Sequence, residues 1–135
     1  MEAMFLALNA RQEQRLEELI KAMVDRFNPL QILCFGSKVE TNAAYSCFFR
    51  DKELDRCSFD LLTITEDGVD AGPEMQAFSN LIYKNGSVKV LHLTIGTVKA
   101  AIEGGDVFVN TILKDGVVLF VREGQDGNYL QQFKT

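Results

Sequence analysis

The chain has no tryptophan, one histidine and only three cysteines among its 135 residues. The cysteines, Cys34, Cys47 and Cys57, form no Cys-x-x-Cys pair, and together with His92 they are too few and too widely spaced for a zinc site. An odd number of separated thiols is typical of a reduced intracellular protein, in which cysteines pack as small hydrophobic side chains. We expect the ten phenylalanines and the aliphatic residues to form the core.

Positive charge and long apolar runs are also scarce. Lysine and arginine number 14 against 19 aspartates and glutamates, so the formal net charge is −5, and no basic stripe suits duplex nucleic acid. A nucleotide held by backbone N–H groups and a metal is compatible with this charge. The N-terminus lacks the positive segment and cleavage site of a signal peptide, and no apolar run could cross a bilayer. We therefore expect a soluble, cytoplasmic protein without a membrane partner.

The spacing of apolar residues predicts helices that alternate with strands. Apolar residues three and four apart predict a first helix, which Asn28-Pro29 should end. Short apolar runs bounded by turn residues predict strands at 30–36, 58–65, 87–94 and 117–121. The first helical pattern spans 11–27, and further helical patterns span 38–49, 73–84, 94–103 and 106–114.

This order predicts a single α/β (α+β) domain with a mixed β-sheet flanked by helices. Residues 1–29 would be an N-terminal helix packed on the core, residues 30–121 the core domain, and residues 122–135 a polar C-terminal tail. The sequence leaves open whether the domain forms a homo-oligomer.

Gly36 and Ser37 directly follow the first predicted strand. Glycine permits a sharp turn, after which backbone N–H groups and the serine hydroxyl can face a phosphate at the start of a helix. Lys38 would add a positive charge there. The alternative interpretation, which fits most Gly-Ser pairs after strands, is an ordinary turn with Lys38 exposed.

Asp60 stands at the head of the second predicted strand, and Ser58 lies two residues earlier on the same side of that strand. Two acids at this spacing can hold Mg²⁺ against a triphosphate and align an in-line attack on phosphorus. Here a serine occupies one of the two places. Alone, Asp60 is equally consistent with an acid at the end of a strand.

Taken in order, the segments LCFGSK, SFDLLTIT and KVLHLT resemble the nucleotidyltransferase superfamily. The chain looks closest to the minimal bacterial nucleotidyltransferase-like domains that occur beside HEPN-domain proteins, as in toxin–antitoxin pairs. The resemblance extends to GGDVFVNTILKDGVVLF and so covers most of the chain. It implies that Gly36, Ser37 and Lys38 bind the nucleotide and that Asp60 is a catalytic acid that binds metal. It also implies Mg²⁺ and a nucleoside triphosphate as ligands and a HEPN-type helical protein as partner.

The chain departs from the family at two of the three expected metal-binding acids. Ser58 stands in place of the first, and Lys89 aligns with the third. Even the loss of residues that only orient metal ligands costs roughly 10–100-fold in affinity or activity, so the loss of the ligands themselves should cost more. Replacement ligands would have to come from the charged segment that contains Asp51, Glu53 and Asp55.

We therefore expect a catalytically impaired or inactive module that binds a nucleotide or a protein, with or without Mg²⁺. The alternative is an active Mg²⁺-dependent nucleotidyltransferase that moves a nucleoside monophosphate to a protein, an RNA or a small molecule. A third alternative is an unrelated small α/β domain. For His92, a packed and hydrogen-bonded position on its strand is the expectation, and a functional group beside the active-site strand is the alternative.

Overall fold

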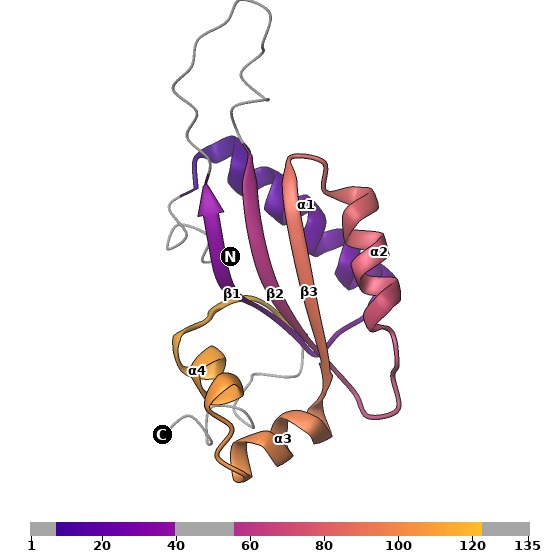
Figure 1. Cartoon of the computed structure of the whole chain (residues 1–135). Coiled ribbons are helices and arrows are strands. Elements are labelled where there is room, and N and C mark those ends of the chain that lie inside the picture. Colours follow the sequence, from indigo (N-terminus) through magenta and orange to yellow (C-terminus); the bar gives the residue numbers. More distant parts are fainter. Residues whose placement is uncertain (1–7, 40–55, 123–135) are drawn as a thin grey trace, which may run out of the picture.

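A computed structural model describes residues 8–39 and 56–122 of the chain. The described residues form, in chain order, α1 (Ala10–Phe27), β1 (Gln31–Val39), β2 (Cys57–Thr65), α2 (Gly72–Ile82), β3 (Gly86–Thr94), α3 (Ile95–Glu103), α4 (Val107–Asp115) and β4 (Val117–Val121) (Figure 1). The predicted class is confirmed: the domain is α+β, with a mixed four-stranded sheet flanked by helices.

The strands lie in the order β3-β2-β1-β4. β2 and β3 are parallel and are joined through α2, whereas β1 runs antiparallel to both β2 and β4. The pairing of β1 with β2 shifts register between Cys34 and Gly36, so Phe35 is an extra residue in a β-bulge. This bulge decides which residues of β1 face each side of the sheet.

Helices α1 and α2 cover one face of the sheet. Phe59 and Leu61 of β2 are almost fully buried there, and the rings of Phe27 and Phe78 join the two helices edge to face with centroids 5.5 Å apart. The core under these helices also contains Leu16, Leu19, Ile20, Met23, Ile32, Cys34, Cys57, Met75, Tyr83 and Val88. The two described cysteines therefore pack as small hydrophobic side chains, as predicted.

The first helix has well-defined ends. Asn9 and Gln12 form a capping box, in which each side chain accepts a hydrogen bond from the other's backbone N–H, at 2.8 and 3.0 Å. The helix ends at Asn28, which adopts the left-handed conformation with φ 49°. The predicted end of this helix at Asn28-Pro29 is confirmed.

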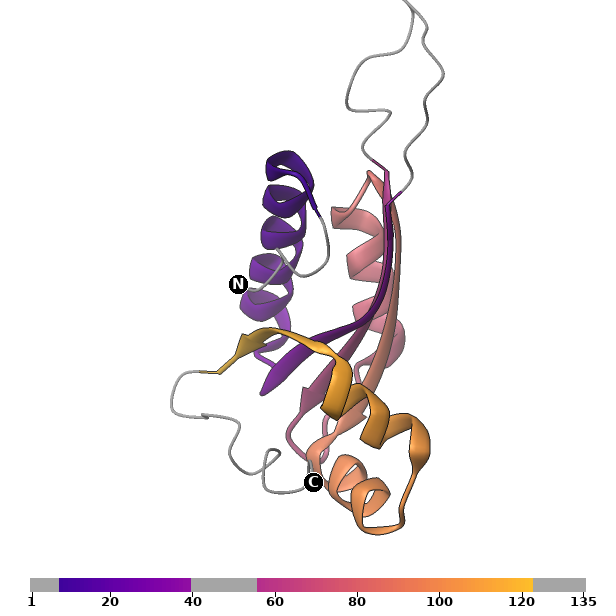
Figure 2. The same cartoon turned by 90° about the vertical axis from the view of Figure 1, so that its left-hand side faces the viewer.

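Helices α3 and α4 cover only one end of the opposite face, as the side view shows (Figure 2). Thr94 and Asp106 cap the two helices by accepting hydrogen bonds from Thr97 N–H and Val109 N–H. The residues buried between these helices and the sheet are Leu30, Leu33, Leu62, Ile64, Val98, Val109, Ile112 and Leu113.

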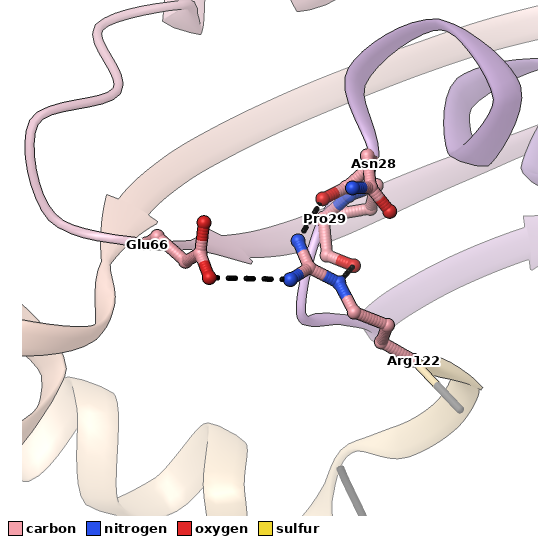
Figure 3. A network of polar contacts seen from close by, with 4 residues as sticks. All are labelled: Asn28, Pro29, Glu66 and Arg122. Atoms are coloured by element: carbon pink, nitrogen blue, oxygen red, sulfur yellow. Dashed lines mark hydrogen bonds and ion pairs between the residues drawn. The ribbon is translucent and has the colours of Figure 1, made fainter. Parts of the chain in front are cut away.

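Arg122, directly after β4, links three parts of the chain (Figure 3). Its guanidinium donates hydrogen bonds to the carbonyls of Asn28 and Pro29, the latter at 3.4 Å, and forms an ion pair with Glu66 at 3.3 Å. Its backbone N–H donates to the Leu30 carbonyl at 2.9 Å. The end of β4 is thereby fixed to the connection between α1 and β1 and to the end of β2.

One predicted boundary is wrong. The first strand does not stop at Gly36, because β1 continues through Val39 and its last residues pair with β2. Lys38 and Val39, predicted as the start of a helix, are strand residues. Val39 packs against the core under α1, and this long-range contact outweighs the local turn signal of Gly-Ser. The rest of the predicted helix at 38–49, Cys47 and the predicted tail beyond Arg122 lie outside the described residues.

Candidate functional site

Two cross-strand rows of mostly polar residues lie on the face that carries α3 and α4, at the end these helices leave uncovered. The strand registers place Lys38, Ser58 and Ser87 in one row and Gly36, Asp60 and Lys89 in the next, and we call these six residues the polar rows. The row after them is apolar and contains Leu62 and Leu91, which belong to the core under α3 and α4. The polar rows therefore border this core.

The polar rows are open to solvent. Lys38, Ser87 and Lys89 are exposed, while Ser58 and Asp60 are half-buried. They carry two ammonium groups against one carboxylate, so their local charge is positive although the chain as a whole carries −5. This part of the sheet is suited to an anion.

Gly36 allows the carboxylate of Asp60 to lie against the backbone of β1. A Cβ atom built at position 36 would lie 2.5 Å from Asp60 Oδ2, closer than side-chain atoms approach, and 3.3 Å from its Cγ. A larger residue at this position would therefore displace the Asp60 carboxylate. The predicted turn at Gly36 is absent, and the residue makes room for Asp60 instead.

Ser58 uses its hydroxyl within the sheet. The hydroxyl of Ser87 donates a hydrogen bond to Ser58 Oγ at 3.0 Å, which joins β2 to β3 on this face. Lys89 lies in register with Asp60 on the neighbouring strand. The resemblance predicted that two of the family's acids are missing, at Ser58 and Lys89. These positions carry a neutral hydroxyl and a positive charge beside the remaining carboxylate of Asp60.

The described residues do not fit a Mg²⁺ ion held by the protein alone. Mg²⁺ takes octahedral oxygen ligands and is usually held by one or two carboxylates together with substrate phosphates. Asp60 is the single carboxylate of the polar rows, and Lys89 beside it opposes a second cation. Among residues 8–39 and 56–122 there is no cluster of three or more His, Cys, Asp or Glu side chains that could hold a metal. Asp51, Glu53 and Asp55 lie outside these ranges.

Ser37 faces the other side of the sheet from Asp60. It pairs with Phe59, whose side chain is buried under α1 and α2. The bulge at Phe35 is the cause, because without it strict alternation from Leu33 would place Ser37 on the face of Asp60. Of the three residues predicted to bind the nucleotide, Gly36 and Lys38 therefore lie on the Asp60 face and Ser37 does not.

His92 lies on the face opposite to Asp60, with Val88 and Val90 of the same strand. Its Nε2 atom is 2.7 Å from the hydroxyl of Thr65. Burial lowers the pKa of His92, and the negative charge of Asp70 offsets part of this effect. The expected position, packed and hydrogen-bonded, is what the structure shows, and His92 is on the wrong face to act with Asp60.

A cleft of about 330 Å³ lies between the bulge of β1 and α4. The rings of Phe35 and Phe108 meet there edge to face, with centroids 5.7 Å apart. The cleft is lined by Cys34, Phe35, Gly36, Ser37, Phe108, Thr111, Ile112, Asp115, Gly116 and Val117. We did not predict this cleft from the sequence. The available signal was the helical stripe of Val109, Ile112 and Leu113, which leaves Phe108 off the buried face.

No family model, curated protein or solved structure matches this chain. Within the ranges that the structure describes, no helix has both the length and the apolar character needed to span a membrane.

Proposed function

We propose that this chain is a nucleotidyltransferase-like domain that acts as a non-catalytic binding module and holds the phosphates of a nucleotide on its polar rows. The observation that carries the proposal is the register of Asp60 with Lys89, next to the hydrogen-bonded pair of Ser58 and Ser87. A serine, Ser58, and a lysine, Lys89, stand where a metal-dependent transferase needs further acids. Such groups bind phosphate oxygens directly through charge-assisted hydrogen bonds.

The two lysines can reach a single anion. Lys38 is on β1 and Lys89 on β3, so β2 separates them, and their rows are adjacent on one face. Neighbouring strands are about 4.8 Å apart and alternate residues about 7 Å apart, which places the two Cα atoms roughly 12 Å from each other. Both side chains are long, flexible and exposed, and an anion above Ser58 would lie between them.

We propose binding of the nucleotide without metal-dependent transfer of a phosphoryl or nucleotidyl group. Phosphoryl and nucleotidyl transfer depend on bound cations that neutralise the developing charge and align the reacting groups. The described donor set supplies one carboxylate, with a lysine beside it. The residues present are thus arranged for binding, with positive charge contributed by the protein itself.

Isothermal titration calorimetry with ATP and GTP, in EDTA and again in Mg²⁺, tests the proposal. We expect binding in EDTA, with no gain in affinity when Mg²⁺ is added. The double variant Lys38→Ala/Lys89→Ala should lose at least about tenfold in affinity, since hydrogen bonds to charged groups contribute roughly 1.5–3 kcal/mol each. The matched control Lys21→Ala/Lys99→Ala removes two exposed lysines of α1 and α3 and should bind as the wild type does.

Three outcomes would contradict the proposal. They are an absence of binding at millimolar nucleotide, binding that requires Mg²⁺, and a Lys38/Lys89 double variant that binds as tightly as the control. Circular dichroism of each variant shows whether the fold is intact.

A further inference from the structure

We propose that the cleft between β1 and α4 binds the base of the nucleotide whose phosphates lie on the polar rows. This inference rests on the proposed function. Base recognition would give the module a preference among phosphate-bearing ligands, which the two exposed lysines alone do not supply.

The cleft has the size and lining of a small-molecule site. Its volume of about 330 Å³ lies within the range of ligand pockets, which are mostly apolar with a few polar groups at fixed places. Here Phe35, Phe108 and Ile112 contribute apolar side chains, and Asp115 contributes a carboxylate.

The exposed aromatic ring of Phe108 favours an aromatic ligand. Phe108 is 53% exposed, although it neighbours Val109, which is buried on the inner side of α4. Its ring meets Phe35 edge to face, which leaves ring surface of both residues at the cleft. Proteins hold unpaired bases by stacking them on aromatic side chains, and every base offers a flat face for this contact.

The cleft and the polar rows adjoin at Gly36. This residue lines the cleft and also stands in register with Asp60 in the second polar row. β4 pairs with β1 only as far as Cys34, so in the described part of the chain the edge of β1 beyond Cys34 has no neighbouring strand. A ligand can therefore lie across this edge, with its phosphates beside Lys38 and its base against Phe108.

Asp115 suggests which base fits best. An ionised carboxylate only accepts hydrogen bonds, and its two oxygens can accept a pair of parallel bonds. Guanine presents two adjacent N–H donors on its pairing edge, whereas adenine presents one amino group there. We expect the exposed carboxylate of Asp115, at the C-terminal end of α4, to favour guanine.

The test compares GTP, ATP and inorganic tripolyphosphate by calorimetry in EDTA. GTP should bind about tenfold more tightly than tripolyphosphate, which is the gain expected from stacking one base. Phe108→Ala should remove most of that gain and leave the affinity for tripolyphosphate unchanged. Asp115→Asn should reduce the preference for GTP over ATP. The matched control is Val107→Ala, which changes an exposed residue next to Phe108 that does not line the cleft.

The outcomes separate this inference from the proposed function. If tripolyphosphate binds through Lys38 and Lys89 but GTP binds no more tightly, the base site is refuted while the phosphate site stands. A GTP advantage that survives Phe108→Ala, or that Val107→Ala removes equally, also overturns the inference. If neither GTP nor tripolyphosphate binds, the proposed function itself fails.

Discussion

Phe59 and Asp60 are neighbours in the chain but lie on opposite faces of the sheet. Phe59 is 1% exposed and packs under α1 and α2, where it meets the ring of Tyr83. Asp60 is half-buried on the face that α3 and α4 cover only at one end. The period-2 alternation of a strand thus lets one segment, β2, contribute to the core and to an open polar surface at the same time.

The two faces of the sheet contribute differently to stability and to the proposed binding. Under α1 and α2, the inward side chains of β2 are apolar along its whole length, apart from Thr63 and Thr65. On the opposite face the apolar core stops at Leu62, and the polar rows follow. Changes on the first face should therefore affect folding, and changes in the polar rows should affect ligand binding.

The largest predicted effect is a loss of stability when a side chain buried under α1 and α2 is removed. Phe59→Ala removes a fully buried aromatic side chain and should lower the free energy of unfolding by about 3–5 kcal/mol. The adjacent change Asp60→Asn should lower it by no more than about 0.5 kcal/mol, because the site is open to solvent. Urea denaturation followed by circular dichroism measures both. Equal losses in the two variants would show that the two faces are not divided in this way.

The contact between Gly36 and Asp60 offers a second test. Gly36→Ala places a methyl group 2.5 Å from the Asp60 carboxylate oxygen and should destabilise the protein by about 1 kcal/mol as that side chain is displaced. Combining it with Asp60→Ser removes the clash, so the two changes should be non-additive by at least about 0.5 kcal/mol. Additive effects in this double-mutant cycle would mean that the close approach does not explain the glycine.

The charge of Asp60 gives a third prediction, now for binding. If the polar rows bind phosphate without a metal, Asp60→Asn should strengthen tripolyphosphate binding in EDTA, because it removes a like charge. One such charge about 4 Å away contributes about 1 kcal/mol in water, or roughly fivefold in affinity. Calorimetry measures the change. Weaker binding in this variant would instead indicate that the carboxylate holds a cation.

The smallest predicted effect is a pH dependence of stability that comes from His92, on the face under α1 and α2. Burial lowers the pKa of His92 below its unfolded value near 6.5, so the unfolded chain takes up the proton first as the pH falls. The stability from neutral His92 is complete above about pH 6.5 and decreases as the pH falls through the depressed folded-state pKa. The free energy of unfolding should therefore decline as the pH falls below about 6.5. His92→Gln removes the only histidine and should flatten this decline, whereas an unchanged decline would assign it to other groups.

Most elements follow from local patterns in the sequence. The apolar stripe of α1, the capping residue Thr94 and the alternation of β3 are short-range signals, and the structure confirms the elements that they predict. The extension of β1 through Lys38 and Val39 does not follow from such signals. It depends on pairing with β2, which begins only after the intervening residues 40–56.

The candidate site was predictable only in part for the same reason. Asp60 and Ser58 share a face because both lie on one strand, and this followed from their spacing alone. That Lys38 rather than Ser37 joins them depends on the bulge at Phe35, which no local pattern predicted. The cleft beside Phe108 depends on how α4 meets β1, a packing relation between distant segments.

The most direct test of the central claim is to map where a phosphate ligand binds on the two faces. Titration of ¹⁵N-labelled protein with tripolyphosphate in EDTA should shift the amide signals of Lys38, Ser58 and Lys89 most strongly. The amides of α1 and α2, on the covered side, should stay unchanged. Shifts centred on α1 and α2, or an absence of shifts at millimolar ligand, would contradict a binding site on the polar rows.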